Sequence, residues 1–308
     1  MKGFKKYSPI LKGILMGTCD IIPGVSGGTI AFITGIYDRL IDALHSFNLT
    51  NLKLLFQGNS KQARKNIDGR FLVMLFGGIG IAILSLSRIL SYGLEQYPQH
   101  IWAFFFGLIL ASAYLMRKYI KQRNFLIILL LILGLLTGYV LSNLQPIAIG
   151  TANITMFISG AIAIIAMILP GISGSYILLI LGQYSILLGY ITNLTHGDTT
   201  GIIPILHFIV GAILGLLAFS KLLHRVKNNY HDQMVGLLIG IMLGSLNKLR
   251  PWKATIQTYI DRHGQEKALI TKNLIPTINQ DFWILLAIMI GGIAIVLGIE
   301  YFAKKLQK

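Results

Sequence analysis

The chain has 308 residues, of which 54% are hydrophobic and only 12% are charged, and its mean hydropathy is +0.69. A soluble domain carries about a quarter charged residues, so the composition excludes a water-soluble enzyme and a disordered chain. The formal net charge is +16. In an integral membrane protein, such an excess of Lys and Arg reflects basic cytoplasmic loops and attraction to anionic lipid rather than nucleic-acid binding. The single cysteine, Cys19, excludes a disulfide framework and a Cys-based zinc site.

Six apolar runs are predicted to cross the membrane as helices. A helix needs about 20 residues to cross a hydrocarbon layer of ~30 Å. The runs cover residues 71–94, 101–116, 125–144, 204–223, 234–246 and 282–302. The second and the fifth run are slightly short, and we expect their polar flanks to complete the crossing.

Two further apolar segments, 11–44 and 155–191, are interrupted in the middle by Pro and Gly. The interruptions are the first loop (residues 23–29, PGVSGGT) and the second loop (residues 170–176, PGISGSY). The arms on either side of each loop are too short to cross the bilayer alone. Each segment is therefore either one broken transmembrane helix or one re-entrant hairpin.

The distribution of Lys and Arg favours two re-entrant hairpins. With a cytoplasmic N-terminus, the outside connections 95–100, 143–154 and 193–203 then contain no Lys or Arg, as the positive-inside rule requires. The loop 248–281 is the exception, and its role stays open. Its six basic residues are Lys248, Arg250, Lys253, Arg262, Lys267 and Lys272. We expect a multi-pass membrane protein with both termini cytoplasmic.

The chain contains an internal repeat at an offset of 147 positions, with nine identities in the 22 positions from Pro23 to Leu44. Each unit is a broken segment followed by three crossings, so the first repeat covers residues 1–150 and the second covers 151–308. Because three is odd, the second unit starts on the opposite side of the membrane. The predicted fold is an all-α polytopic membrane protein built as an inverted repeat. The alternative to a repeat is that the two segments are Gly-rich helix kinks that resemble each other by chance.

The two loops are candidate phosphate-binding sites. Unpaired backbone amides are costly in hydrocarbon unless protein or ligand satisfies them, and free N–H groups at a helix start favour an anion. The candidate residues are Gly24, Val25, Ser26, Gly27, Gly28, Thr29, Gly171, Ile172, Ser173, Gly174 and Ser175. The alternative is that the glycines serve only close helix packing.

Two charged residues in apolar surroundings are candidates for coupling or attraction of charge. Asp20 precedes the first loop and is either a proton or cation site, a partner for an arginine, or a helix-end carboxylate bonded to backbone amides. Arg88 is expected near the outer end of its span, where it either attracts an anionic head group or extends to the interface. The histidines have no metal-ligand spacing, so no metal site and no cofactor are predicted.

The stretch 16–29 (MGTCDIIPGVSGGT) resembles the bacterial polyprenyl-phosphate translocases, and the resemblance covers essentially the whole chain. It implies a location in the bacterial cytoplasmic membrane and return of undecaprenyl phosphate, the carrier lipid for cell-wall glycans, from the outer to the inner leaflet of that membrane. The implied partners are the polyprenyl-phosphate lipid, membrane lipids and a coupling proton or cation, without nucleic acid. The oligomeric state and any tail-length selectivity stay open.

A membrane-embedded undecaprenyl-pyrophosphate phosphatase is the alternative function. Such phosphatases are similar in having re-entrant hairpins and a Pro-Gly-x-Ser-Arg-Ser-type loop, and they also use a glutamate pair. The arginine position is Gly27 in the first loop and Gly174 in the second, and none of the three glutamates is close to either loop in sequence. Without these groups, electrostatic and acid–base catalysis lose their main contributors. The sequence therefore favours a transporter over an enzyme.

Overall fold

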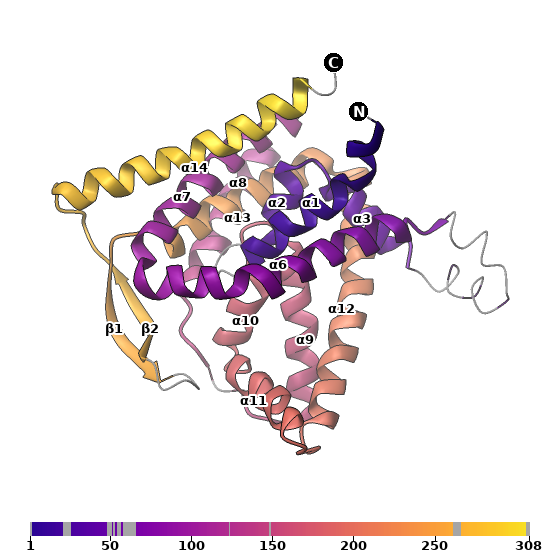
Figure 1. Cartoon of the computed structure of the whole chain (residues 1–308). Coiled ribbons are helices and arrows are strands. Elements are labelled where there is room, and N and C mark those ends of the chain that lie inside the picture. The colour runs from indigo at the N-terminus through magenta and orange to yellow at the C-terminus, as the bar shows by residue number, and fades with distance from the viewer. Residues whose placement is uncertain are drawn as a thin grey trace.

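The computed structural model describes residues 2–20, 26–47, 51, 53, 57, 66–122, 124–147, 149–260 and 266–305. These residues form mainly helices, with one β-hairpin (Figure 1). The helices are α1 (Lys2–Asp20), α2 (Gly27–Ile33), α3 (Tyr37–His45), α6 (Gly69–Gln96), α7 (Pro98–Met116), η1 (Arg117–Tyr119), α8 (Phe125–Asn143), α9 (Asn153–Ile168), α10 (Gly174–Ile180), α11 (Tyr184–Thr195), α12 (Ile202–Asn229), α13 (His231–Leu249) and α14 (Gln280–Lys305). The strands are β1 (Lys253–Ile260) and β2 (Glu266–Asn273).

Five helices in the described part of the chain are long and apolar enough to cross a membrane, namely α6, α7, α8, α12 and α14. They contain five of the six predicted spans. The sixth, 234–246, lies within α13, a 19-residue helix whose side chains are largely buried inside the protein. By contrast, only 17% of the residues in the apolar windows of α12 and α14 are buried, so most of their surface is suited to contact with lipid tails.

The long helices pack in pairs through residues without bulky side chains. α1 lies along α6, α9 along α12, α7 along α14, and α8 along α13 (Figure 1). A Cβ atom added at Gly240 of α13 would lie 2.1 Å from the carbonyl oxygen of Leu131, and one added at Gly134 of α8 would lie 2.2 Å from that of Leu237. The backbones therefore approach as closely as in other small-residue interfaces between membrane helices.

The two broken segments have the same local backbone at the predicted offset. α2 and α10 have seven residues each, and each begins directly after a serine. Gly35 and Gly182, which follow these helices, both have a φ angle of +67°. The turns that lead into α3 and α11 also match, because the N–H of Ile36 and that of Gln183 each donate a 2.9 Å bond to a carbonyl five residues earlier. α10 and α11 are bent by 104° relative to each other.

The structure differs from the all-helical prediction in the loop 248–281, which contains an antiparallel β-hairpin. Lys253 pairs with Asn273, and Ala254 pairs with Lys272. The strands are rich in Thr, Ile and Tyr, residues that favour extended backbone. The hairpin extends from the end of the helical bundle near the start of α14 (Figure 1).

The main hydrophobic core surrounds α13 and α7. Leu238 and Met242 of α13 and Ile109 of α7 are almost completely buried, as are Leu75 of α6 and Ile41 of α3. The second loop packs directly on this core, because a Cβ atom added at Gly171 would lie 2.9 Å from the Cα atom of Met242. The core thus supports the loop that the sequence predicts to be functional.

Candidate functional site

The amides at the start of α2 are satisfied within the chain. The Oγ atom of Ser26 accepts a 3.1 Å hydrogen bond from the N–H of Gly28 and so caps the helix. The Oδ1 atom of Asp20 accepts a 2.7 Å bond from the N–H of Gly27, and the N–H of Thr29 donates to the carbonyl of Ser26. Of the predicted residues in this loop, Gly24 and Val25 lie outside the described residues. In this conformation an anion could reach the amide of Gly27 only by displacing Asp20.

The two predicted loops lie in direct contact although they are 147 positions apart in the chain. The hydroxyl group of Ser26, at the first loop, lies 3.0 Å from the carbonyl oxygen of Leu169 and donates to it. In the opposite direction, the N–H of Gly171 donates a 3.1 Å bond to the Oγ1 atom of Thr29. Ser26 and Thr29 are completely buried. The described residues of both loops therefore belong to one structural unit.

The second loop has a different arrangement of donors. Gly171 has a φ angle of +87°, a backbone conformation that is unfavourable for residues with a Cβ atom. The Oγ atom of Ser173 accepts a 3.4 Å bond from the N–H of Tyr176 and lies 2.9 Å from the Oγ atom of Ser175. Within the described residues, the N–H groups of Gly174 and Ser175 form no hydrogen bond. Ile172 is buried, and its N–H donates to the carbonyl of Leu169.

The two loops also differ in charge. The carboxylate of Asp20 accepts a hydrogen bond from the first amide of α2. At the corresponding position before the second loop, the residue is Met167, which has no charge. The Oδ2 atom of Asp20 is buried and has no hydrogen-bond partner among the described residues. Of the alternatives for Asp20, the geometry favours a carboxylate bonded to a backbone amide. The other predicted charge, Arg88, belongs to α6, but its side chain lies outside the described part of the structure.

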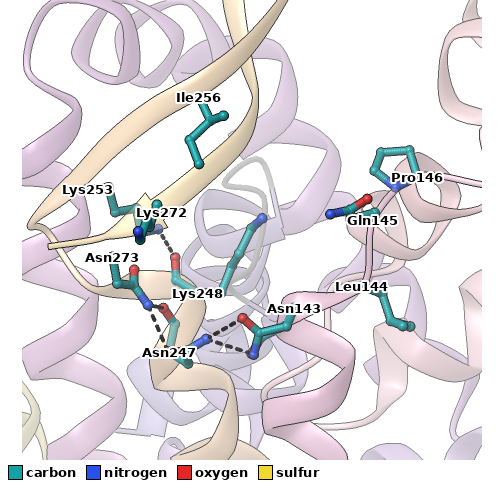
Figure 2. Close-up of a pocket in the computed structure, with 11 residues that line it drawn as sticks. Asn143, Leu144, Gln145, Pro146, Asn247, Lys248, Lys253, Ile256, Lys272 and Asn273 are labelled. Carbon is teal, nitrogen blue, oxygen red and sulfur yellow. Dashed lines mark hydrogen bonds between the residues drawn. The ribbon is translucent and has the colours of Figure 1, made fainter.

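A cavity of about 280 Å³ lies where the hairpin meets the ends of α8 and α13 (Figure 2). We call it the lysine pocket, because Lys248, Lys253 and Lys272 contribute to its lining. The other lining residues are Ser142, Asn143, Leu144, Gln145, Pro146, Asn247, Ile256 and Asn273. Sequence reasoning did not select this site. The available signal was the excess of basic residues in a loop that the positive-inside rule would leave without them.

A second, smaller cavity is lined both by residues of the second loop and by two residues of the lysine pocket. We call it the loop cavity; its volume is about 10 Å³, about the room that one water molecule requires. Gly171, Ser173 and Tyr176 line it on the side of the loop, and Ser142 and Lys248 line both cavities. The pocket and the second loop are thus neighbours, separated by a narrow space.

Comparisons with known proteins agree on one family. Residues 16–267 match a family model described as undecaprenyl phosphate translocase-like. A polyprenyl-phosphate transporter of Vibrio cholerae is 41% identical over 311 aligned residues, which cover 99% of each chain. A polyprenyl-phosphate transporter of Staphylococcus aureus is 30% identical over 258 residues, or 80% of this chain and 87% of that protein. No solved structure matches the chain.

Proposed function

The chain belongs to the undecaprenyl phosphate translocase-like family, and on this basis we propose that it returns undecaprenyl phosphate from the outer to the inner leaflet of the cytoplasmic membrane. The two similar relatives are named polyprenyl-phosphate transporters. The observation that carries the proposal is the contact between the two loops through Ser26 and Thr29. It places small residues, hydroxyl groups and backbone amides from both halves of the chain at one position.

An inverted repeat would allow this position to open toward either side of the membrane. The matched turns of the broken segments support such a repeat, and so do the helices that follow them. α6 and α12 have 28 residues each, and α7 and α13 have 19 residues each. The pairing of α1 with α6 corresponds to that of α9 with α12. We propose that one half rocks against the other around the paired loops, with both termini on the cytoplasmic side.

In the proposed transport cycle the lipid phosphate binds at the loops while the polyprenyl chain stays in the surrounding lipid. Amides and hydroxyl groups of the second loop, including Gly174, Ser173 and Ser175, donate hydrogen bonds to the phosphate oxygens. At the first loop, phosphate competes with the carboxylate of Asp20 for the amide of Gly27. Protonation of Asp20, or binding of a cation there, would release this amide and couple the lipid to an ion.

The geometry also disfavours the phosphatase alternative. A phosphatase-type loop would need an arginine at the position of Gly27 or Gly174. A Cβ atom at Gly27 would lie 2.6 Å from Oδ2 of Asp20, and one at Gly174 would lie 2.7 Å from the carbonyl oxygen of Ala163. Neither position accepts a larger side chain without rearrangement, so the proposed function is transport without hydrolysis.

Reconstitution into liposomes tests this function. Purified protein is incorporated into vesicles with undecaprenyl phosphate in the outer leaflet, and the head group accessible to a membrane-impermeant phosphatase is followed over time. We expect the amount of lipid accessible to this phosphatase to fall only when the protein is present. No inorganic phosphate should be released before the phosphatase is added. An imposed pH gradient should change the rate if Asp20 couples transport to protons. Unchanged lipid accessibility together with phosphate release from undecaprenyl pyrophosphate would establish the enzyme instead.

A further inference from the structure

The lysine pocket concentrates positive charge, because three lysines and no acidic residue are among the described residues that line it. None of the ion pairs formed within the described residues includes Lys248, Lys253 or Lys272. Burial and the charge of Lys248 lower the pKa of Lys253 to about 7. Placing like charges around one cavity costs free energy unless an anion enters it. The cavity therefore has the electrostatics of a binding site for an anion.

The side chains of this pocket are held in place by contacts on several elements. The Nζ atom of Lys248 lies 4.6 Å from the ring centre of Tyr176, and that of Lys253 lies 4.7 Å from the ring centre of Trp102. The ammonium group of Lys253 also donates to the backbone carbonyl of Lys248. Cation–π contacts of this kind orient a lysine while leaving part of its ammonium group free to donate.

A chain of asparagine side chains fixes the hairpin to the helices that form the other walls (Figure 2). The side-chain amide of Asn273 on β2 donates a 2.8 Å bond to Oδ1 of Asn247 on α13. Asn247 in turn donates a 3.1 Å bond to Oδ1 of Asn143 at the end of α8. The three walls of the pocket are thus connected before any ligand binds, which lowers the entropic cost of binding.

We propose that the lysine pocket docks the phosphate monoester head group of a polyprenyl lipid before the head group reaches the loops. This inference rests on the proposed function. A phosphate monoester carries up to two negative charges and three strong acceptor oxygens, which suit three ammonium groups. The cavity of about 280 Å³ lies just below the ~300–1,000 Å³ typical of ligand pockets. It suits a head group and leaves the polyprenyl chain in the membrane.

The loop cavity gives the docked phosphate a route toward the second loop. Lys248 lines both cavities, and its ammonium group lies over Tyr176, whose N–H is bonded to Ser173. At about 10 Å³ the loop cavity is too small for a phosphate group. Passage therefore requires Lys248 and Tyr176 to separate, so docking and transfer to the loop are successive steps.

Chemical labelling of the wild-type protein tests docking without any substitution. Purified protein in lipid nanodiscs is treated with an amine-reactive reagent in four parallel samples. Three samples contain undecaprenyl phosphate, phosphatidylglycerol or inorganic phosphate, and the fourth contains no added ligand. Modification of each lysine is measured by mass spectrometry. We expect undecaprenyl phosphate to protect Lys253 and Lys272, with Lys221 of α12 as an internal reference. Equal modification under all conditions would overturn the proposal. The proposal would also be overturned if only inorganic phosphate protected these lysines, or if phosphatidylglycerol protected them as well as undecaprenyl phosphate does. In either case the pocket would not select the lipid monoester.

Substitutions then separate docking from transport itself. Lys253→Gln and Lys272→Gln should each weaken binding of undecaprenyl phosphate by about tenfold, the scale of one hydrogen bond to a charged group. Arg250→Gln removes the same charge from the same loop, but Arg250 does not line the pocket, so it should bind like the wild type. In liposomes, excess lipid should restore transport by both lysine variants. Binding and transport identical to those of Arg250→Gln would refute docking and leave the function standing, whereas absence of wild-type transport would refute the function.

Discussion

The carboxylate of Asp20 accepts a 2.7 Å hydrogen bond from the backbone N–H of Gly27. It thus occupies the position at the first loop where a bound anion would be expected. Met167 stands at the equivalent position of the second loop and has no charge. The two loops therefore lead into matching helices and turns but differ in charge, and we propose that this difference couples lipid binding to a cation.

Asp20→Asn tests whether this charge takes part in transport. The amide oxygen of asparagine can still accept the bond from Gly27, so the fold should be retained. Transport should fall by about tenfold or more, since a charge-assisted interaction contributes ~1.5–3 kcal/mol. Initial rates in liposomes and thermal unfolding in detergent measure the two effects. Asp198→Asn, at a fully exposed carboxylate, is the control. Wild-type rates in Asp20→Asn would remove Asp20 from the mechanism.

Gly28→Ala tests the close contact between the loops. Its Cβ atom would lie 2.6 Å from the carbonyl oxygen of Ile168 at the end of α9, so the two segments would have to separate. We expect a loss of stability of about 1–3 kcal/mol, as for other overpacked sites, together with slower transport. Gly77→Ala in α6 adds the same methyl group where no atom outside its own stretch of helix backbone lies within 4 Å, and its stability should stay the same or rise by up to about 1 kcal/mol. Equal stability of both variants would contradict the contact.

The pKa of Lys253, lowered to about 7 by burial and by Lys248, predicts a pH dependence of lipid binding. Lys253 is protonated below this pH and loses its charge as the pH rises. Burial also lowers the pKa of Lys248, another lysine that lines the pocket, so its loss of charge would act in the same direction. A phosphate monoester has its second pKa near 6, so its own charge changes little above pH 7.

Affinity for undecaprenyl phosphate should therefore fall as the pH rises from about 7 to about 8.5. Lys253→Arg keeps its charge throughout this range, so its affinity should change much less. Binding titrations of both proteins at several pH values provide the comparison. Parallel pH profiles would show that another group titrates.

The sequence predicted the features that depend on local pattern. The apolar runs identified the long helices, and the nine identities at an offset of 147 marked two segments whose turns at Gly35 and Gly182 have the same φ angle. Pro-Gly-x-Ser-Gly loops in apolar surroundings also indicated that the chain must satisfy exposed amides there. The bond between Gly171 and Thr29 shows that these two loops lie in contact in the folded chain.

Features that depend on tertiary distance could not be predicted. Asn143 and Asn273 are linked through Asn247, but they come from segments separated by more than a hundred residues. The strands of the hairpin lie in the loop 248–281, whose basic residues are an exception to the positive-inside rule but do not indicate strands. The convergence of Lys248 and Lys272 on one cavity required the register of β1 with β2, which composition does not specify.

We propose that the paired loops bind the lipid phosphate during its passage across the membrane. The most direct test compares initial rates of undecaprenyl phosphate translocation in liposomes for Ser26→Ala/Ser173→Ala and for Ser220→Ala. Ser220 is a buried serine of α12 whose hydroxyl, among the described residues, donates only to the carbonyl of Leu217. We expect at least tenfold slower translocation and weaker lipid binding for the double variant, with wild-type rates for Ser220→Ala. Equal rates in all three proteins at equal stability would contradict it.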